Sequence, residues 1–173
     1  MSPKKITPVI HYSIDASQTH SHLFRVSLHI AEPQAAQVVS LPVWIPGSYL
    51  VREFAKNLQR LKATQGGKHV ATHQDHKSQW LIQCKEGQAL QLSYEVYAFD
   101  NSVRSAWLDT QRGFFNGTSL CLRVCVAGID AVVNSRGIFI RTHVAAAPIK
   151  QLNAATRVRC KRIGNHSCRP ASR

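Results

Sequence analysis

The feature that most constrains this chain is a two-residue alternation of apolar and polar side chains, which recurs along its first 124 residues. Alternation with a period of two places one set of side chains on a core face and the other set toward water, as in a half-buried β-strand. It predicts about eight strands, in residues 10–14, 24–30, 39–43, 58–64, near 70, 80–84, 90–98 and 120–124. The expected fold is therefore all-β, an antiparallel sandwich or saddle-shaped sheet, with one short helix after Tyr49.

The regular pattern stops after Ala98, where a long connection continues to Thr118. This connection carries charged and amide side chains interleaved with aromatic ones, and it ends in the turn-forming pair Asn116-Gly117. Long connections of this kind inside a regular sheet are more often functional loops than random coil. We expect its aromatic residues to anchor the loop, with the Phe114 ring buried in the core.

Two long stretches resemble motifs of one known domain. They read AFDNSVRSAWLDTQRGFFNGTSL (residues 98–120) and LPVWIPGSYLVREFAKNLQRLKA (residues 41–63). Both resemble the N-terminal β domain of the glycyl aminopeptidase family, which comprises thermolysin-like zinc metallopeptidases that also carry a C-terminal PDZ domain. The resemblance runs from about residue 10 to residue 124, and two long motifs in the right order are harder to meet by chance than one short pattern.

The resemblance implies a non-catalytic domain that forms one wall of the peptide-binding cleft of a zinc aminopeptidase. The family's zinc-binding His-Glu-x-x-His pattern does not occur in this sequence. We therefore expect no catalytic residue, no metal ligand and no cofactor within the chain itself, and a sequence truncated before the catalytic domain. Zinc and a peptide substrate are implied only for the full-length family member, where a zinc-bound water attacks the peptide bond.

Six residues are candidates for contact with a substrate. Arg104, Asp109 and Asp100 have the charges to face a peptide's carboxylate and amine, or alternatively to fix the loop through charge-assisted hydrogen bonds. Asn116 is expected to adopt a left-handed or turn-capping conformation, although its amide also suits a peptide backbone. Tyr49 and Arg52 follow a Pro-Gly turn and are expected beside the same loop. Trp44, Trp80 and Trp107 are interpreted as core residues, with Trp107 as the first exception because it lies in the loop.

Charge divides the chain into two parts. The formal net charge is +13, of which residues 1–124 contribute +5 (thirteen Lys/Arg, eight Asp/Glu) and residues 125–173 contribute +8 (nine Lys/Arg, one Asp). We predict a β domain at 1–124 and an irregular, divergent basic tail at 125–173, whose composition also fits a shifted reading frame. With Phe139 as its single aromatic residue, the tail lacks stacking partners for bases, so no specific nucleic-acid binding is expected.

Other constellations give weaker signals. His69 and His73 stand four residues apart, but Val70 occupies the place of a zincin glutamate, and Gly66-Gly67 favours a polar hairpin over a helix. His20 and His22 fall in a predicted turn. The five cysteines contain no Cys-x-x-Cys pair and are interpreted as buried or incidental free thiols.

Neither a signal-peptide core nor a membrane-spanning apolar run is found in the sequence, which favours a cytoplasmic protein without membrane contact. The oligomeric state is left open. A second hypothesis is a stand-alone β-sandwich module that binds peptide or carbohydrate through residues 99–118. A third and weaker one is a basic protein associated with nucleic acid.

Overall fold

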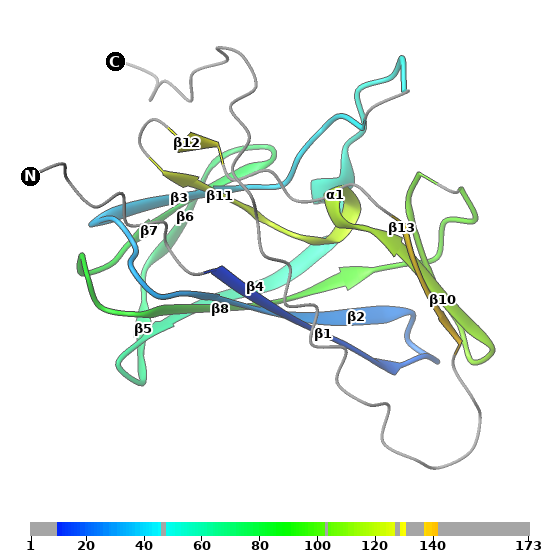
Figure 1. The fold of residues 1–173 in the computed structure, drawn as a ribbon, viewed down its shortest axis with the longest axis horizontal. Coiled ribbons are helices and arrows are strands. Elements are labelled where there is room, and N and C mark those ends of the chain that lie inside the picture. Colours follow the sequence, from blue (N-terminus) through cyan, green and yellow to red (C-terminus); the bar gives the residue numbers. More distant parts are fainter. Residues whose placement is uncertain (1–9, 46–47, 103, 127–128, 131–136, 142–173) are drawn as a thin grey trace, which may run out of the picture.

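The computed structural model describes residues 10–45, 48–102, 104–126, 129–130 and 137–141. The strands in this part of the chain all pair antiparallel and form two five-stranded sheets and one three-stranded sheet (Figure 1). The prediction of an all-β fold is confirmed. The described part contains thirteen strand segments, more than the eight expected, because several are only two to five residues long.

The first five-stranded sheet has the order β1-β2-β8-β4-β5. Its strands are β1 (Ile10–Gln18), β2 (Leu23–Ile30), β8 (Leu90–Tyr97), β4 (Leu58–Gln65) and β5 (Lys68–Val70). Alternate side chains of β2 are buried, as the sequence predicted, and β2 pairs with β8 along its whole length from Leu23 opposite Tyr97 to Ile30 opposite Leu90. The Gly66-Gly67 turn between β4 and β5 has positive φ at both glycines, which fits the expected hairpin.

The second five-stranded sheet has the order β12-β11-β3-β7-β6. Its strands are β12 (Ile129–Asp130), β11 (Arg123–Val126), β3 (Ala36–Ser40), β7 (Gln79–Gln83) and β6 (Thr72–His76). One apolar cluster joins the two five-stranded sheets, with Phe24, Leu28 and Leu92 from the first and Val39 and Ile82 from the second all fully buried. The core therefore lies between these sheets, as in a sandwich.

The third sheet corrects the prediction for residues 99–118. This segment is not a continuous loop, because β9 (Ala106–Leu108) and β10 (Arg112–Asn116) form a hairpin within it. A four-residue helical turn, α1 (Gly117–Leu120), follows at once, so the strand expected at 120–124 begins only at Arg123. The short helix expected after Tyr49 is the 3₁₀ turn η1 (Phe54–Asn57).

Two buried tyrosine hydroxyls tie the first sheet to the chain that follows α1. Tyr94 Oη donates to the Leu120 carbonyl oxygen at 3.0 Å and accepts from the Leu122 backbone N–H at 3.1 Å. Tyr12 Oη donates to the Leu122 carbonyl oxygen. Burial raises the pKa of both phenols, so both stay protonated over the ordinary pH range and remain available as donors.

Part of the predicted tail belongs to a sheet. Strand β13 (Gly137–Arg141) pairs antiparallel with β10, from Asn116 opposite Gly137 to Arg112 opposite Arg141. Residues 142–173, which make up most of the predicted tail, lie outside the described residues. The domain boundary at residue 124 therefore stays a prediction. Among the described residues, no helix has the length and apolar content needed to span a membrane.

The sequence predicted the burial of some aromatic residues wrongly, both on β10 and among the tryptophans. Phe115, and not Phe114, is the core ring: it is 2% exposed and packs edge-on against Phe24 with 5.3 Å between ring centroids. Trp80 is buried as expected, but Trp44 is 53% exposed and is not a core residue. Alternation explains the first error, since neighbouring positions of a strand face opposite sides and the register of β10 cannot be derived from its sequence.

We expect Phe115→Ala to lower the free energy of unfolding by about 3–5 kcal/mol, the usual cost of removing a buried phenylalanine ring. The matched variant Phe114→Ala removes the same atoms from a partly buried site and should cost clearly less. Chemical denaturation of both variants measures the difference. Equal losses in the two variants would show that the register of β10 has been misassigned.

Candidate functional site

Two segments carry the six residues that the sequence singled out. Tyr49 and Arg52 lie between β3 and η1, in a segment that extends away from the sheets beyond α1 (Figure 1, cyan). Asp100 and Arg104 precede β9, Asp109 lies in the β9–β10 turn, and Asn116 ends β10.

Asn116 is a buried helix cap. Its Oδ1 accepts from the backbone N–H of Ser119 at 2.9 Å and from the hydroxyl of Thr118, and its Nδ2 donates to the Ser105 carbonyl oxygen at 3.4 Å. Its backbone is extended, with φ −110° and ψ 153°, so the predicted capping role is confirmed and the left-handed conformation is wrong. The amide of Asn116 is thus directed at its own chain.

Asp100 is bonded to the same region. Its carboxylate accepts from the backbone N–H of Ser102 at 3.0 Å and from the hydroxyl of Ser105 at 2.9 Å. The Ser105 carbonyl in turn accepts from Ser119 Oγ at 3.2 Å as well as from Asn116. The sequence analysis overlooked Ser102 and Ser105 as partners of Asp100, although the Asp100-x-Ser102 pattern is typical of an Asx turn.

Asp109 organises the β9–β10 turn. Its carboxylate accepts from Trp107 Nε1 at 2.8 Å and from the backbone N–H groups of Gln111 and Arg112 at 2.8 and 2.7 Å. Partial burial disfavours the charged form, but these three hydrogen bonds and the nearby Arg112 guanidinium outweigh it and lower the pKa of Asp109. The alternative in which loop charges fix the loop therefore holds for Asp109.

Arg104 contributes its backbone N–H, which donates to Ser102 Oγ at 3.3 Å, but in the described part of the chain its side chain is not paired with either aspartate. Its side chain is exposed, and within the described residues the side-chain partners of Asp100 and Asp109 are serine, tryptophan and Arg112. The predicted ion pairs from Arg104 to these aspartates are not formed. Arg104 thus remains a charged side chain facing solvent.

A stack of aromatic rings, which sequence reasoning overlooked, fixes the base of the hairpin. Phe99 stacks on Trp107 with 4.4 Å between ring centroids and packs at a tilt against the His22 ring with 4.0 Å between centroids. The guanidinium carbon of Arg112 lies 5.6 Å from the centroid of the Trp107 ring. His22 lies in the predicted turn between β1 and β2, but its Nδ1 donates to the Leu108 carbonyl oxygen. The hairpin is therefore held to β1 and β2 by packing as well as by hydrogen bonds.

The segment with Tyr49 and Arg52 is closed by its own hydrogen bonds. The backbone N–H of Arg52 donates to the Val43 carbonyl at 2.7 Å, and Trp44 Nε1 donates to the Ser48 carbonyl at 2.7 Å. Tyr49 is fully exposed, and the Nε of Arg52 is buried. Within the described residues, this Nε is the buried side-chain nitrogen or oxygen atom that lacks a hydrogen-bond partner.

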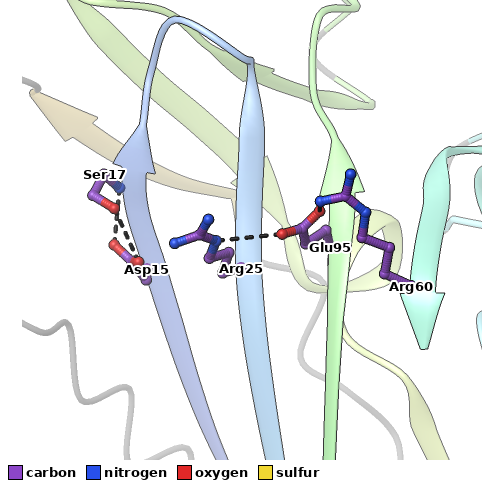
Figure 2. A network of polar contacts seen from close by, with 5 residues as sticks. All are labelled: Asp15, Ser17, Arg25, Arg60 and Glu95. Carbon is purple, nitrogen blue, oxygen red and sulfur yellow. Dashed lines mark hydrogen bonds and ion pairs between the residues drawn. The ribbon is translucent and has the colours of Figure 1, made fainter. Parts of the chain in front are cut away.

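A separate polar cluster lies on the other face of the first sheet. Figure 2 shows Glu95 on β8 between Arg25 on β2 and Arg60 on β4, with ion-pair distances of 3.3 and 3.1 Å. Glu95 is 9% exposed, so two cations compensate one nearly buried carboxylate. On the adjacent strand β1, the Asp15 carboxylate accepts from the backbone N–H and the hydroxyl of Ser17. We interpret this cluster as cross-strand pairing that supports the sheet.

The described residues do not supply a zinc site. His69 and His73 lie exposed on β5 and β6, which confirms the hairpin in place of a helix. Among the described residues, no three His, Cys, Asp or Glu side chains come together to hold a metal ion. Cys121 and Cys125 are both buried, and burial raises the pKa of the Cys121 thiol to about 12, which leaves that thiol unreactive at neutral pH.

Comparison with known proteins identifies the domain. The sequence model of the family described as Peptidase M61 N-terminal domain matches residues 11–129. The chain belongs to the Peptidase M61 N-terminal domain family. This confirms the resemblance to an N-terminal β domain of a peptidase. A comparison with curated proteins found no match.

A solved structure supports the same assignment for the M61 domain. It is the crystal structure of an aminopeptidase N family protein from Idiomarina loihiensis, similar to this chain with 45% sequence identity and a TM-score of 0.64. The match covers 66% of this chain and 19% of that one. The M61 domain thus spans about a fifth of the neighbour's length.

We expect Asp109→Asn to lower the free energy of unfolding at pH 7, because the lowered pKa means that folding stabilises the ionised carboxylate. That stabilisation is complete above the unfolded value of 3.8 and is lost as the pH falls through the folded pKa. The stability difference from the unsubstituted chain should therefore shrink below pH 3.8.

Denaturant unfolding of the two proteins at pH 7 and pH 3 tests this. The variant Asp75→Asn removes the same charge from an exposed position on β6 and serves as the control. A constant difference between Asp109→Asn and the unsubstituted chain at both pH values would contradict the proposed role of the charge.

Proposed function

We propose that this M61 domain forms one wall of the peptide-binding cleft of a zinc aminopeptidase and takes no part in the bond-breaking chemistry. Family membership and the likeness to an aminopeptidase N family protein support this proposal. When bound in a peptidase, zinc activates a water molecule for attack on the peptide bond. The described residues contribute no ligand set for that ion, so the catalytic groups belong to another part of such a protein. A cytoplasmic location stays a prediction.

The exposed position of Tyr49 is the observation that favours a cleft wall most directly. Its side chain is fully exposed although the backbone around it is closed by hydrogen bonds at Ser48 and Arg52. A large aromatic ring on a braced segment loses little conformational freedom when a ligand packs against it. Its hydroxyl group can also donate to a peptide carbonyl or accept from a peptide N–H.

The other candidates differ in whether their polar groups already form hydrogen bonds within the domain. Three of them already accept hydrogen bonds within the hairpin and α1: Asp100, Asp109 and Asn116. We therefore propose that these three support the fold of the cleft wall and do not contact the substrate. Arg104 is exposed and stays a candidate for a substrate carboxylate. Tyr49 and Arg104 are therefore the side chains that we propose to face the cleft.

The purified 173-residue chain should show no aminopeptidase activity on glycyl or alanyl substrates with added zinc, because the described residues do not assemble a zinc ligand set. A chromogenic assay measures this. Turnover that a chelator abolishes and that the double variant His69→Ala/His73→Ala lacks would contradict the expectation.

In a chimera in which residues 11–129 replace the matching domain of the Idiomarina loihiensis protein, Tyr49→Ala should raise KM for a short peptide substrate several-fold. The kcat should stay within about twofold, because a wall residue contributes equally to substrate and transition-state binding. Steady-state kinetics on an alanyl peptide measures both values.

Tyr97→Ala is the matched control, because Tyr97 is a second exposed tyrosine (44%) that lies on β8 outside the segment of Tyr49. It should leave KM unchanged. Equal KM values for Tyr49→Ala and the unsubstituted chimera would contradict the cleft-wall proposal. Direct binding of a peptide or sugar to the isolated chain would instead favour the stand-alone binding module.

A further inference from the structure

Exposed apolar side chains gather in one short stretch of the chain. Within the described residues, five of the seven exposed large hydrophobic side chains lie between positions 43 and 51. They are Val43 (38% exposed), Trp44 (53%), Tyr49 (104%), Leu50 (66%) and Val51 (74%). Single exposed leucines are normal on a protein surface, but five exposed apolar side chains within nine residues, called the apolar patch below, favour a site of interaction.

The patch is preorganised by hydrogen bonds between its two arms. The arm with Val43 and Trp44 is joined to the arm with Leu50 and Val51 through Arg52 N–H to the Val43 carbonyl and Trp44 Nε1 to the Ser48 carbonyl, both at 2.7 Å. Ile45 and Phe54 anchor the arms in the core at 8% and 4% exposure. The outward side chains are therefore held in place before any partner arrives, which lowers the entropic cost of association.

Arg52 adds a charge to this patch. Its Nε is buried without a hydrogen-bond partner in the part of the chain that the structure describes. A buried donor left unpaired destabilises the free domain, and a carboxylate is the partner that best satisfies a guanidinium group. Residues 1–124, which include this patch, carry a net charge of +5, which also favours an acidic partner surface.

We propose that Val43, Trp44, Leu50, Val51 and Arg52 form a docking face for the remainder of an M61 peptidase, at an apolar surface that carries a carboxylate opposite Arg52. This inference rests on the proposed function, because it takes the peptidase part as the occupant. Two observations favour that occupant: the domain spans only 19% of its structural neighbour, and Tyr49, the proposed substrate contact, lies within the same segment. Docking here would place Tyr49 at the junction between the two parts.

The chimera with residues 11–129 of this chain tests the docking face by differential scanning calorimetry. The unsubstituted chimera should unfold in one coupled transition. Leu50→Ser/Val51→Ser should separate it into two transitions, because these side chains are 66% and 74% exposed in the domain and contribute to docking alone. Tyr97→Ser removes another exposed side chain and should leave a single transition. One transition in the Leu50→Ser/Val51→Ser variant would overturn the proposal.

Arg52→Met, which replaces the buried Nε by a carbon atom and removes the charge, provides an independent test with opposite expectations in two settings. In the 173-residue chain the melting temperature should stay the same or rise, because the substitution removes an unpaired buried donor. In the chimera it should weaken the coupling between the transitions, because the carboxylate of the partner loses its cation. A lower melting temperature in the isolated chain and an unchanged chimera would show that Arg52 acts within the domain, and would overturn its role in docking.

These results separate docking from the cleft-wall function. If the transitions separate as expected while Tyr49→Ala leaves KM unchanged, the docking face holds and the cleft-wall proposal fails. If Tyr49→Ala raises KM while Leu50→Ser/Val51→Ser keeps a single transition, the cleft wall holds and this docking face fails. Chymotryptic cleavage at the domain junction, faster in the Leu50→Ser/Val51→Ser variant than in the Tyr97→Ser variant, reports the same loss of docking by a second method.

Discussion

The hydrogen bonds of Tyr94 to the backbone of residues 120–122 are the contacts on which the arrangement of this domain depends. They join a central strand of the first sheet to the segment that leads from α1 into the second sheet. Residues Leu120 and Leu122 on that segment are fully buried, so its backbone groups have little access to water and need partners within the protein. Tyr12 supplies a further bond at Leu122, and the two hydroxyls together fix how α1 meets the core.

The β9–β10 hairpin leads directly into α1 and is held by hydrogen bonds at both of its ends. At its α1 end, Asn116 and Ser119 bond to Ser105, which Asp100 also holds. At its turn, Asp109 bonds Trp107 and Arg112. Three of the six candidate substrate contacts, Asp100, Asp109 and Asn116, are therefore bonded within the hairpin and α1. Partial burial disfavours the charged form of Asp109, but the hydrogen bonds from Trp107 and from two backbone N–H groups lower its pKa.

The segment between β3 and η1 differs from the hairpin, because it leaves large side chains exposed to solvent. Its backbone bonds close it on itself, its ends are anchored by Ile45 and Phe54, and its apolar side chains are left facing solvent. A domain that spans about a fifth of its structural neighbour has a physical reason to expose such a surface, since the remainder of a longer chain can cover it. The same face carries the buried, unpaired Arg52 Nε, which gives the proposed docking a charge requirement as well as an apolar one.

The sequence by itself determined the all-β class, most strand positions, the Gly66-Gly67 hairpin and the family. Alternation and turn chemistry act over a few residues, and long motifs carry the family signal, so neither needs tertiary information. The sequence did not determine which of Phe114 and Phe115 enters the core, that Trp44 faces solvent, or which partners Asp100, Asp109 and Asn116 take. Only the tertiary structure decided these. Burial depends on which sheet covers a side chain, and the partners of the three polar residues, although close in sequence, come within bonding distance only when the turns and the β9–β10 hairpin form.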